Sequence, residues 1–391
     1  MSGVSGVSVQ QAWSHDQVEK IRGLWQRYDS QLIIAVLALM GIGLVMVASS
    51  SISIATRGLG DPLHYFWRQS VYVALGLLMM LAATRIPLQV WRKSSPVLLG
   101  IGALMLLLVF VPGLGREVNG SMRWLSLGPI NLQPSELMKL FMVLYLAGYL
   151  VRRGELVRNT VGGFIRPMSI LAVIGVMLLF EPDYGATVVL FTTALGMLFL
   201  GGVPFWSFVG WASFVVVSMG VVVMAAPYRV DRMLTFMNPW AEPLGSGYQL
   251  TQALIAIGSG EWFGVGLGSS VQKLFYLPEA HTDFLFAVLA EELGMVGVLV
   301  VILLFTFVVW RAIAIGTRAE MAGHAYGAYL AYGVGLLIGL QAFVNIGVNM
   351  GVLPTKGLTL PLMSYGGSSL LVNSFAVGLV MRVDHEMRGR S

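Results

Sequence analysis

Pro278-Glu-Ala-His-Thr-Asp-Phe284 runs without a break into the apolar stretch Leu285-Phe-Ala-Val-Leu-Ala-Glu-Glu-Leu-Gly294. The first part is a polar turn, and the second begins an apolar run long enough to cross a membrane. Asp283 is therefore expected in the first turn of a helix, where water meets the membrane. The helix dipole favours an ionised carboxylate there, whereas desolvation favours a protonated one. The stretch alone fits either an ordinary helix cap or a proton acceptor with a tuned pKa.

Composition places the whole chain in the membrane class. Of the 391 residues, 57% are apolar and 11% are charged, and the mean hydropathy is +0.79. These values exclude a water-soluble globule and indicate a polytopic membrane protein. The absence of cysteine excludes disulfides and thiol chemistry. Residues 1–30 are polar and show no cleavable signal, so we expect an N-terminal cytoplasmic tail.

Ten apolar segments are long enough to span a ~30 Å hydrocarbon core, which takes ~20 residues. We therefore predict an all-α fold with about ten transmembrane helices, at 31–51, 67–84, 95–112, 135–151, 164–181, 185–201, 204–226, 283–310, 323–350 and 365–382. This domain, over 31–382, lies between the tail 1–30 and a short tail 383–391. One long loop, about 227–282, joins spans seven and eight. Within it, residues 248–257 have the spacing of an amphipathic helix that lies along the membrane surface.

Basic residues set the expected orientation. With the N-terminus in the cytoplasm, 15 of the 24 Lys and Arg residues fall in cytoplasmic segments, eight fall in outer segments, and Lys139 lies within a span. The positive-inside rule therefore predicts that both termini are cytoplasmic and that Asp283 faces outward. These loops account for the net charge of +5, so no nucleic-acid partner is predicted.

Polar side chains also occur at depths where they are costly. Gln341, Asn345 and Asn349 recur every four residues on one face of span nine. They either hydrogen-bond between helices or line a wet cavity. Glu136 and Lys139 share a face of span four and can neutralise each other. The alternative is that Lys139 attracts an anion just below the outer surface.

The other carboxylates near Asp283 do not suit chemistry with it. Glu291 and Glu292 follow after eight or nine residues, a helical rise of ~12–13.5 Å. That exceeds the ~5–9.5 Å of two-carboxylate glycoside chemistry. We expect both to be deep in the bundle, neutral or paired. The spacing Glu279-x-His281-x-Asp283 resembles metal ligands but lacks a fourth one, so no metal site is predicted.

Outward loops supply cations around the single acid. Arg123 beside Trp124 suits a phosphate or sugar, and Lys356 and Arg229 or Arg232 add positive charge. No nucleotide-binding loop or His-Glu-x-x-His motif occurs. The combination fits sugar transfer from a pyrophosphate-linked membrane lipid, in which cations hold the diphosphate and a carboxylate removes a proton. It fits a transporter of an anionic lipid equally well.

Four groups of residues together resemble the SEDS family (shape, elongation, division and sporulation), over about residues 30–385. They are Arg123-Trp124 with Gln133-Pro-Ser-Glu136, Pro182-Asp-x-Gly185, the stretch 278–294, and Pro361-Leu-Met-Ser-Tyr-Gly-Gly-Ser-Ser369. Residues 349–357 and the long N-terminal tail are similar to the division branch of the family rather than the elongation branch. Tyr184 and Ala280 depart from the family pattern, but neither is the expected base.

The resemblance implies a multi-pass inner-membrane peptidoglycan glycosyltransferase of the division septum, with a periplasmic active site. It implies that Asp283 is catalytic and that lipid II is polymerised into β-1,4-linked strands with release of undecaprenyl pyrophosphate. The residues expected to bind substrate or pyrophosphate are Arg123, Lys356, Lys139, Arg229, Glu136, His281 and Ser368. A lipid II flippase is the alternative, and a structural scaffold for division is the third reading.

The resemblance also implies partners: lipid II with the nascent lipid-linked glycan, a class B penicillin-binding protein, and other divisome membrane proteins. It implies no firm cofactor and leaves a divalent cation such as Mg²⁺ open.

Overall fold

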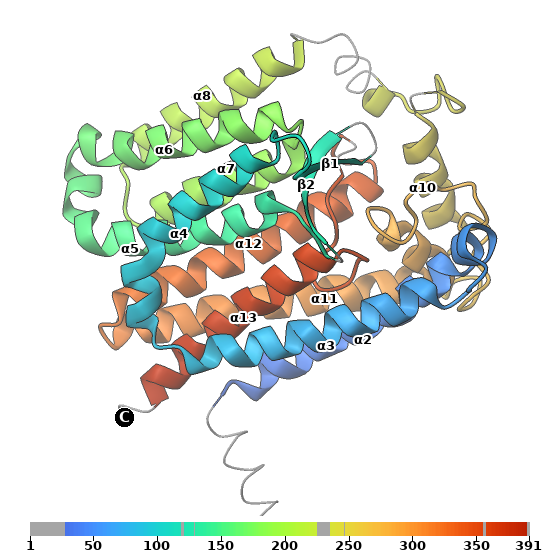
Figure 1. Cartoon of the computed structure of the whole chain (residues 1–391), viewed down its shortest axis with the longest axis horizontal. Coiled ribbons are helices and arrows are strands. Elements are labelled where there is room, and N and C mark those ends of the chain that lie inside the picture. The colour runs from blue at the N-terminus through green and yellow to red at the C-terminus, as the bar shows by residue number, and fades with distance from the viewer. Residues whose placement is uncertain are drawn as a thin grey trace, which may run out of the picture.

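The computed structural model describes residues 28–118, 121–128, 130–224, 235–245, 247–354 and 357–388. Its long helices run side by side along one axis (Figure 1). They are α2 (Ser30–Leu59), α3 (His64–Arg85), α4 (Leu88–Leu108), α5 (Pro134–Asn159), α6 (Val161–Phe180), α7 (Tyr184–Leu200), α8 (Phe205–Met224), α11 (Leu285–Met321), α12 (Ala325–Asn349) and α13 (Gly367–Arg388). Each of them overlaps one of the ten predicted ranges.

Seven helices in the described part of the chain are long and apolar enough to cross a membrane: α2, α3, α4, α5, α6, α11 and α12. α7 is apolar but has only 17 residues, and charged residues interrupt the last turns of α13. The predicted helical, multi-pass architecture is confirmed, whereas the count of ten spans stays a prediction.

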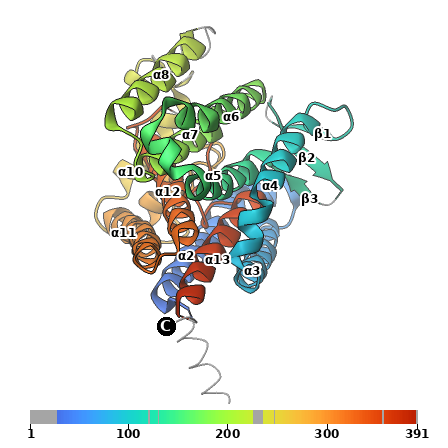
Figure 2. The same cartoon turned by 90° about the vertical axis from the view of Figure 1, so that its left-hand side faces the viewer.

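α5 and α12 form the centre of the bundle. In α5, 78% of the most apolar window is buried, and in α12 61%, against 22% in α3 and in α4. α5 packs on α4, α6, α7 and α12, and α12 also packs on α11 and α13. Figure 2 shows both helices in the middle, with α3, α4 and α8 toward the edges. Polar residues on α5 and α12 are therefore the ones most removed from lipid.

A small β-sheet interrupts the otherwise helical chain, which the sequence analysis did not predict. β1 (Gly115–Val118), β2 (Ser121–Leu127) and β3 (Ile130–Leu132) form an antiparallel sheet in that order. In its register Arg116 pairs with Trp124. Asn-Gly, a frequent hairpin signal, stands at 119–120 between the first two strands and was the missed cue. The sheet presents Arg123 directly before α5.

The long loop contains the predicted helix, here α10 (Tyr248–Ser259). Its apolar residues Leu250, Ala253 and Ala256 are buried, and it packs on α11 and α12. The apolar side of α10 is therefore covered by the two neighbouring helices, and its place along the membrane surface stays a prediction.

The segment after α10 is tied to a kink in α11. Gly294 has φ 65° and ψ −166° within that helix, a conformation that favours glycine. The opened backbone accepts hydrogen bonds from the loop: Val265 N donates to Glu291 O at 2.9 Å, and Gly266 N donates to Glu292 O at 3.1 Å. The loop thereby becomes a fixed extension of α11.

Candidate active site around Asp283

Asp283 lies two residues before the start of α11, because Phe284 occupies the N-cap position and the helix begins at Leu285. The predicted place in the first turn is therefore corrected by two residues. Its main-chain carbonyl accepts hydrogen bonds from Asn345 Nδ2 at 2.9 Å and from Asn349 Nδ2 at 3.0 Å. Two side-chain amides thus hold the backbone of this residue in place.

The amide stripe on α12 joins three segments of the site. Asn345 Nδ2 also donates to Leu358 O at 2.5 Å, and Asn349 Oδ1 accepts from Ala287 N at 3.2 Å. Of the two alternatives left by the sequence, hydrogen bonding between segments is the one observed. The stripe fixes the turn at Asp283 to the chain around residue 358.

One turn deeper, Gln341 meets the ion pair of α5. Lys139 Nζ donates to Glu136 Oε1 at 2.8 Å and to Gln341 Oε1 at 2.7 Å. The side chains of Lys139 and Glu136 are 1% and 5% exposed. These internal contacts favour the structural ion pair over a direct contact of Lys139 with substrate.

Arg123 faces the same side of Gly357 as the Asp283 carboxylate. A Cβ atom added at Gly357 would lie 3.1 Å from Asp283 Oδ2 and 3.9 Å from Arg123 Nη1. Arg123 is anchored by main-chain carbonyls, since Nε donates to Glu181 O at 3.2 Å and Nη2 donates to Pro182 O at 2.6 Å. Neither bond neutralises its charge. An acid and a cation are thus placed around one small residue.

The surroundings of Asp283 bring its pKa close to neutral pH. Burial raises the pKa of Asp283 to about 7, Glu279 and Asp183 add to the rise, and Arg123 opposes it. A carboxylate with this pKa is partly ionised at pH 7 and accepts a proton more readily than an exposed aspartate. Of the two readings left by the sequence, the tuned proton acceptor is favoured.

A second acid near Arg123 is held neutral. Glu181 is fully buried, and neither of its carboxyl oxygens has a hydrogen-bond partner among the residues that the structure describes. Burial raises the pKa of Glu181 to about 9, the nearby Asp183 adds to the rise, and Arg123 opposes it. A protonated Glu181 leaves the positive charge of Arg123 available to a ligand.

Asp183 caps α7 and ties it to the start of α5. Its carboxylate accepts from Ala186 N at 3.1 Å, from Ser135 Oγ at 2.8 Å and from Gln133 Nε2 at 3.2 Å. Neither Glu181 nor Asp183 was among the site residues predicted from the sequence, although their charge at a membrane edge was a signal. Gly185 does not supply a positive φ there. It is needed for close approach, since a Cβ atom on it would lie 2.6 Å from Leu358 Cγ.

The helices α3, α5, α7, α11 and α13 all begin at this end of the bundle (Figure 1). The N-terminus of each helix carries a partial positive charge and free N–H groups. Arg123 adds a full charge to these dipoles. Such an arrangement favours an anion, and phosphate groups are typical ligands of helix N-termini.

His281 and Ser368 support the site through packing and hydrogen bonds. The His281 ring lies 4.7 Å from the Tyr65 ring and 5.5 Å from the Tyr365 ring. Burial lowers the pKa of His281, which favours the neutral ring. Ser368 Oγ accepts from Gln133 N at 3.0 Å and donates to Asn131 O. Two further predicted ligands, Lys356 and Arg229, lie outside the described residues.

Glu291 and Glu292 are buried and bonded, which confirms their predicted place in the bundle. Glu292 Oε1 lies 2.7 Å from Lys273 Nζ and accepts from Ser49 Oγ. Glu291 accepts from Val271 N at 2.9 Å. Among the residues that the structure describes, no three His, Asp or Glu side chains are grouped so as to hold a metal ion.

Known proteins are similar to this chain over almost its whole length. The sequence profile of the family described as "Cell cycle protein", named for FtsW, RodA and SpoVE, matches residues 30–389. The "Probable peptidoglycan glycosyltransferase FtsW" of Nitrosococcus halophilus is 58% identical over 370 residues, 95% of each chain. Its counterpart in Thioalkalivibrio sulfidiphilus is 57% identical over 383 residues, 98% of this chain and 96% of the relative.

Solved structures agree with these sequence relatives. One, described as "Structural coordination of polymerization and crosslinking by a peptidoglycan synthase complex", has a TM-score of 0.75 at 31% identity and covers 92% of this chain and 98% of that chain. The crystal structure of the rod shape determining protein RodA from Thermus thermophilus has a TM-score of 0.69 at 29% identity. It covers 93% of this chain and 98% of that one.

Proposed function

The chain belongs to the FtsW, RodA and SpoVE family of cell cycle proteins, and we propose that it polymerises lipid II into glycan strands for the division septum. It is a peptidoglycan glycosyltransferase embedded in a membrane. The observation that carries the mechanism is the placement of Asp283, with a pKa of about 7, beside Arg123 at the end of the bundle where α3, α5, α7, α11 and α13 begin.

In the proposed reaction, the Asp283 carboxylate removes the proton from the 4-hydroxyl of the GlcNAc of an incoming lipid II. That oxygen attacks the anomeric carbon of the growing lipid-linked glycan from the face opposite its pyrophosphate. The new bond is a β-1,4 linkage, so the configuration inverts. The bond to the pyrophosphate oxygen breaks, and undecaprenyl pyrophosphate leaves with the electron pair.

The departing pyrophosphate gains negative charge as its bond breaks, and cations with helix N-termini stabilise that charge. Arg123 is well suited because its anchors are neutral carbonyls and its neighbour Glu181 is protonated. Lys356 and Arg229 would add charge from adjacent loops. Lys139, Glu136, His281 and Ser368 act in this scheme mainly by positioning α5, α12, α13 and the turn at Asp283.

The reaction needs partners and a defined side of the membrane. We place both termini in the cytoplasm and Asp283 on the periplasmic side of the inner membrane, as the distribution of basic residues favours. A penicillin-binding protein that cross-links the new strands is the expected partner, specifically one of class B, together with other divisome membrane proteins. Support comes from the similarity to a chain described as part of a synthase complex for polymerization and crosslinking.

A paired assay on purified protein separates polymerase from flippase. The protein and its partner in proteoliposomes receive labelled lipid II, and glycan strands are resolved by gel while headgroup translocation is followed in parallel. We expect strands to form with no gain in translocation. Translocation without strands would instead establish the transporter alternative.

A further inference from the structure

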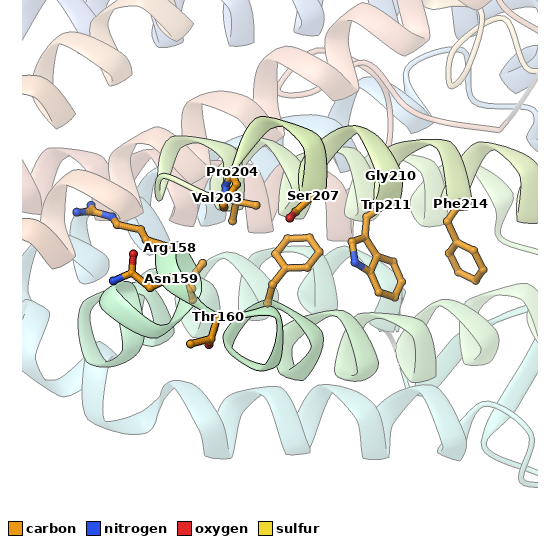
Figure 3. A pocket seen from close by; sticks show the side chains of 11 residues that line it. Arg158, Asn159, Thr160, Val203, Pro204, Ser207, Gly210, Trp211 and Phe214 are labelled. Carbon is orange, nitrogen blue, oxygen red and sulfur yellow. The ribbon is translucent and has the colours of Figure 1, made fainter.

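The chain contains a cavity of about 380 Å³ far from Asp283, between α8 and the turn that joins α5 to α6. Figure 3 shows it in the space between the α6 and α8 ribbons. It lies at the end of the bundle opposite the β-sheet and the helix N-termini that surround Asp283 (Figure 1). Glycosyl transfer as described above leaves this cavity without a role.

The walls and the mouth of the cavity differ in chemistry. Phe164, Trp211 and Phe214 form an aromatic wall, and the ring centroids of Phe164 and Trp211 are 5.9 Å apart. Arg158 and Asn159 lie together at one end (Figure 3). The cavity is therefore amphipathic, with an apolar body and a polar, positively charged mouth.

Arg158 is positioned to bind an anion. Its Nε donates to Gly201 O at 3.0 Å, which orients the guanidinium. The terminal amino groups of its guanidinium make no hydrogen bond or ion pair within the described residues. The Asn159 amide adds a neutral polar group at the same end, whereas the Thr160 hydroxyl donates to Leu156 O and accepts from Gly163 N. Arginine with such neighbours is a common phosphate ligand.

α8 leaves room for an amphiphile because it packs mainly on α7. Its side toward α6 is lined by aromatic rings, with the small residue Gly210 among them. A Cβ atom added at Gly210 would meet no atom within 4 Å. The gap is thus open along the helix.

We propose that this cavity binds one anionic phospholipid, with its phosphate at Arg158 and Asn159 and an acyl chain along Phe164, Trp211 and Phe214. A free phosphate would leave the aromatic wall uncovered, and a neutral apolar chain would leave Arg158 unmatched. Basic sites between membrane helices are suited to anionic headgroups, and the volume lies within the range of small-molecule sites. In the proposed orientation the lipid belongs to the cytoplasmic leaflet.

Native mass spectrometry of the full-length protein in detergent tests the proposal. The probes are phosphatidylglycerol, phosphatidylcholine of the same chains, and inorganic phosphate as a competitor. We expect one tightly retained phosphatidylglycerol, weaker phosphatidylcholine, and no displacement by phosphate. Equal retention of both lipids, or full displacement by phosphate, would overturn the proposal.

Two pairs of variants locate the site. Gly210→Phe fills the cavity and should abolish retention, whereas Gly220→Phe, on the same helix with equally open space around it, should not. Arg158→Gln should weaken phosphatidylglycerol binding about fivefold, the effect of one basic residue near a membrane surface. Arg166→Gln should leave the binding unchanged, because Arg166 is also exposed but does not line the cavity. The melting temperature of each variant shows whether it is folded. If folded Gly210→Phe protein retains the lipid as well as the unsubstituted protein does, the lipid binds elsewhere and the proposal is wrong.

Discussion

At the scale of single residues, Asp283 owes its chemistry to contacts that the sequence does not display. Two amides hold its carbonyl, burial with two acids raises its pKa, and Arg123 limits that rise. Without Arg123 the pKa of Asp283 would rise further, and its carboxyl group would be ionised only at higher pH. Base and cation are therefore coupled through pH as well as position.

The pH profile of polymerisation should follow the ionisation of Asp283. Since the ionised form is the base, activity is present above the pKa of about 7 and lost below it, with about a tenth of the plateau rate left at pH 6. Initial rates between pH 5.5 and 8.5 measure this. Arg123→Gln should move the midpoint to higher pH, and a profile that is flat from pH 6 to 8 would refute the assignment.

Gly357 lies close to both the Asp283 carboxylate and the Arg123 guanidinium. Gly357→Ala would place a methyl group 3.1 Å from Asp283 Oδ2, closer than an ordinary contact, so the carboxylate must move. Small displacements of reacting groups cost up to about a hundredfold in rate, and we expect at least a tenfold fall in strand formation. The thermal melt should change little. An active Gly357→Ala enzyme would show that the space beside Asp283 is not used.

At the scale of elements, α12 organises the site from the middle of the bundle. The Asn345 amide donates both to the Asp283 carbonyl and to the carbonyl of Leu358. The contact with Leu358 is buried and the contact with Asp283 is partly buried, so their loss costs stability as well as alignment. The stripe therefore couples packing to catalysis.

Asn345→Ala should reduce both the stability of the protein and its rate of strand formation. Lost buried hydrogen bonds cost about 1–3 kcal/mol, and misplacement of Asp283 should lower the rate about tenfold or more. Asn373→Ala is the matched control, since that amide is equally buried but bonds Ser369 O, within α13. Melting temperature and strand formation are measured for both variants. A control as inactive as Asn345→Ala would mean that stability alone explains the loss.

Glu292 lies on α11 and connects this helix to the loop that follows α10 through its ion pair with Lys273. Glu292→Gln removes the ionic partner of the buried Lys273, and breaking a buried ion pair costs about 3–5 kcal/mol. We expect a lower melting temperature in detergent, with the rate per folded molecule retained at temperatures below the melt. Loss of activity in fully folded protein would instead give Glu292 a direct role.

The sequence predicted each long helix because a run of apolar residues is a local property. It did not predict the β-sheet, whose strands are short and partly polar, or the burial of α10 on α11. It singled out Asp283, Arg123 and the α12 amides. Partners such as Asn345 with Asp283, which are 62 residues apart, depend on packing, and no spacing rule reveals them. The same is true of Glu181, whose burial follows from the fold alone.

At the scale of the whole molecule, the two ends of the bundle differ in what they can bind. One end gathers the N-termini of α3, α5, α7, α11 and α13 with Arg123 and Asp283, which suits a diphosphate and a proton acceptor. The other end carries the amphipathic cavity at Arg158. Such a difference between the two ends of the bundle is expected of an enzyme that acts on a lipid-linked substrate from one side of a membrane.

The most direct measurement is strand formation from lipid II by purified Asp283→Asn protein together with its penicillin-binding partner. Asparagine is as large as aspartate and leaves the hydrogen bonds to the main-chain carbonyl of residue 283 in place. Its side-chain amide cannot accept the proton of the attacking hydroxyl. The account predicts an unchanged melting temperature and no glycan strands. Polymerisation at the unsubstituted rate would contradict it.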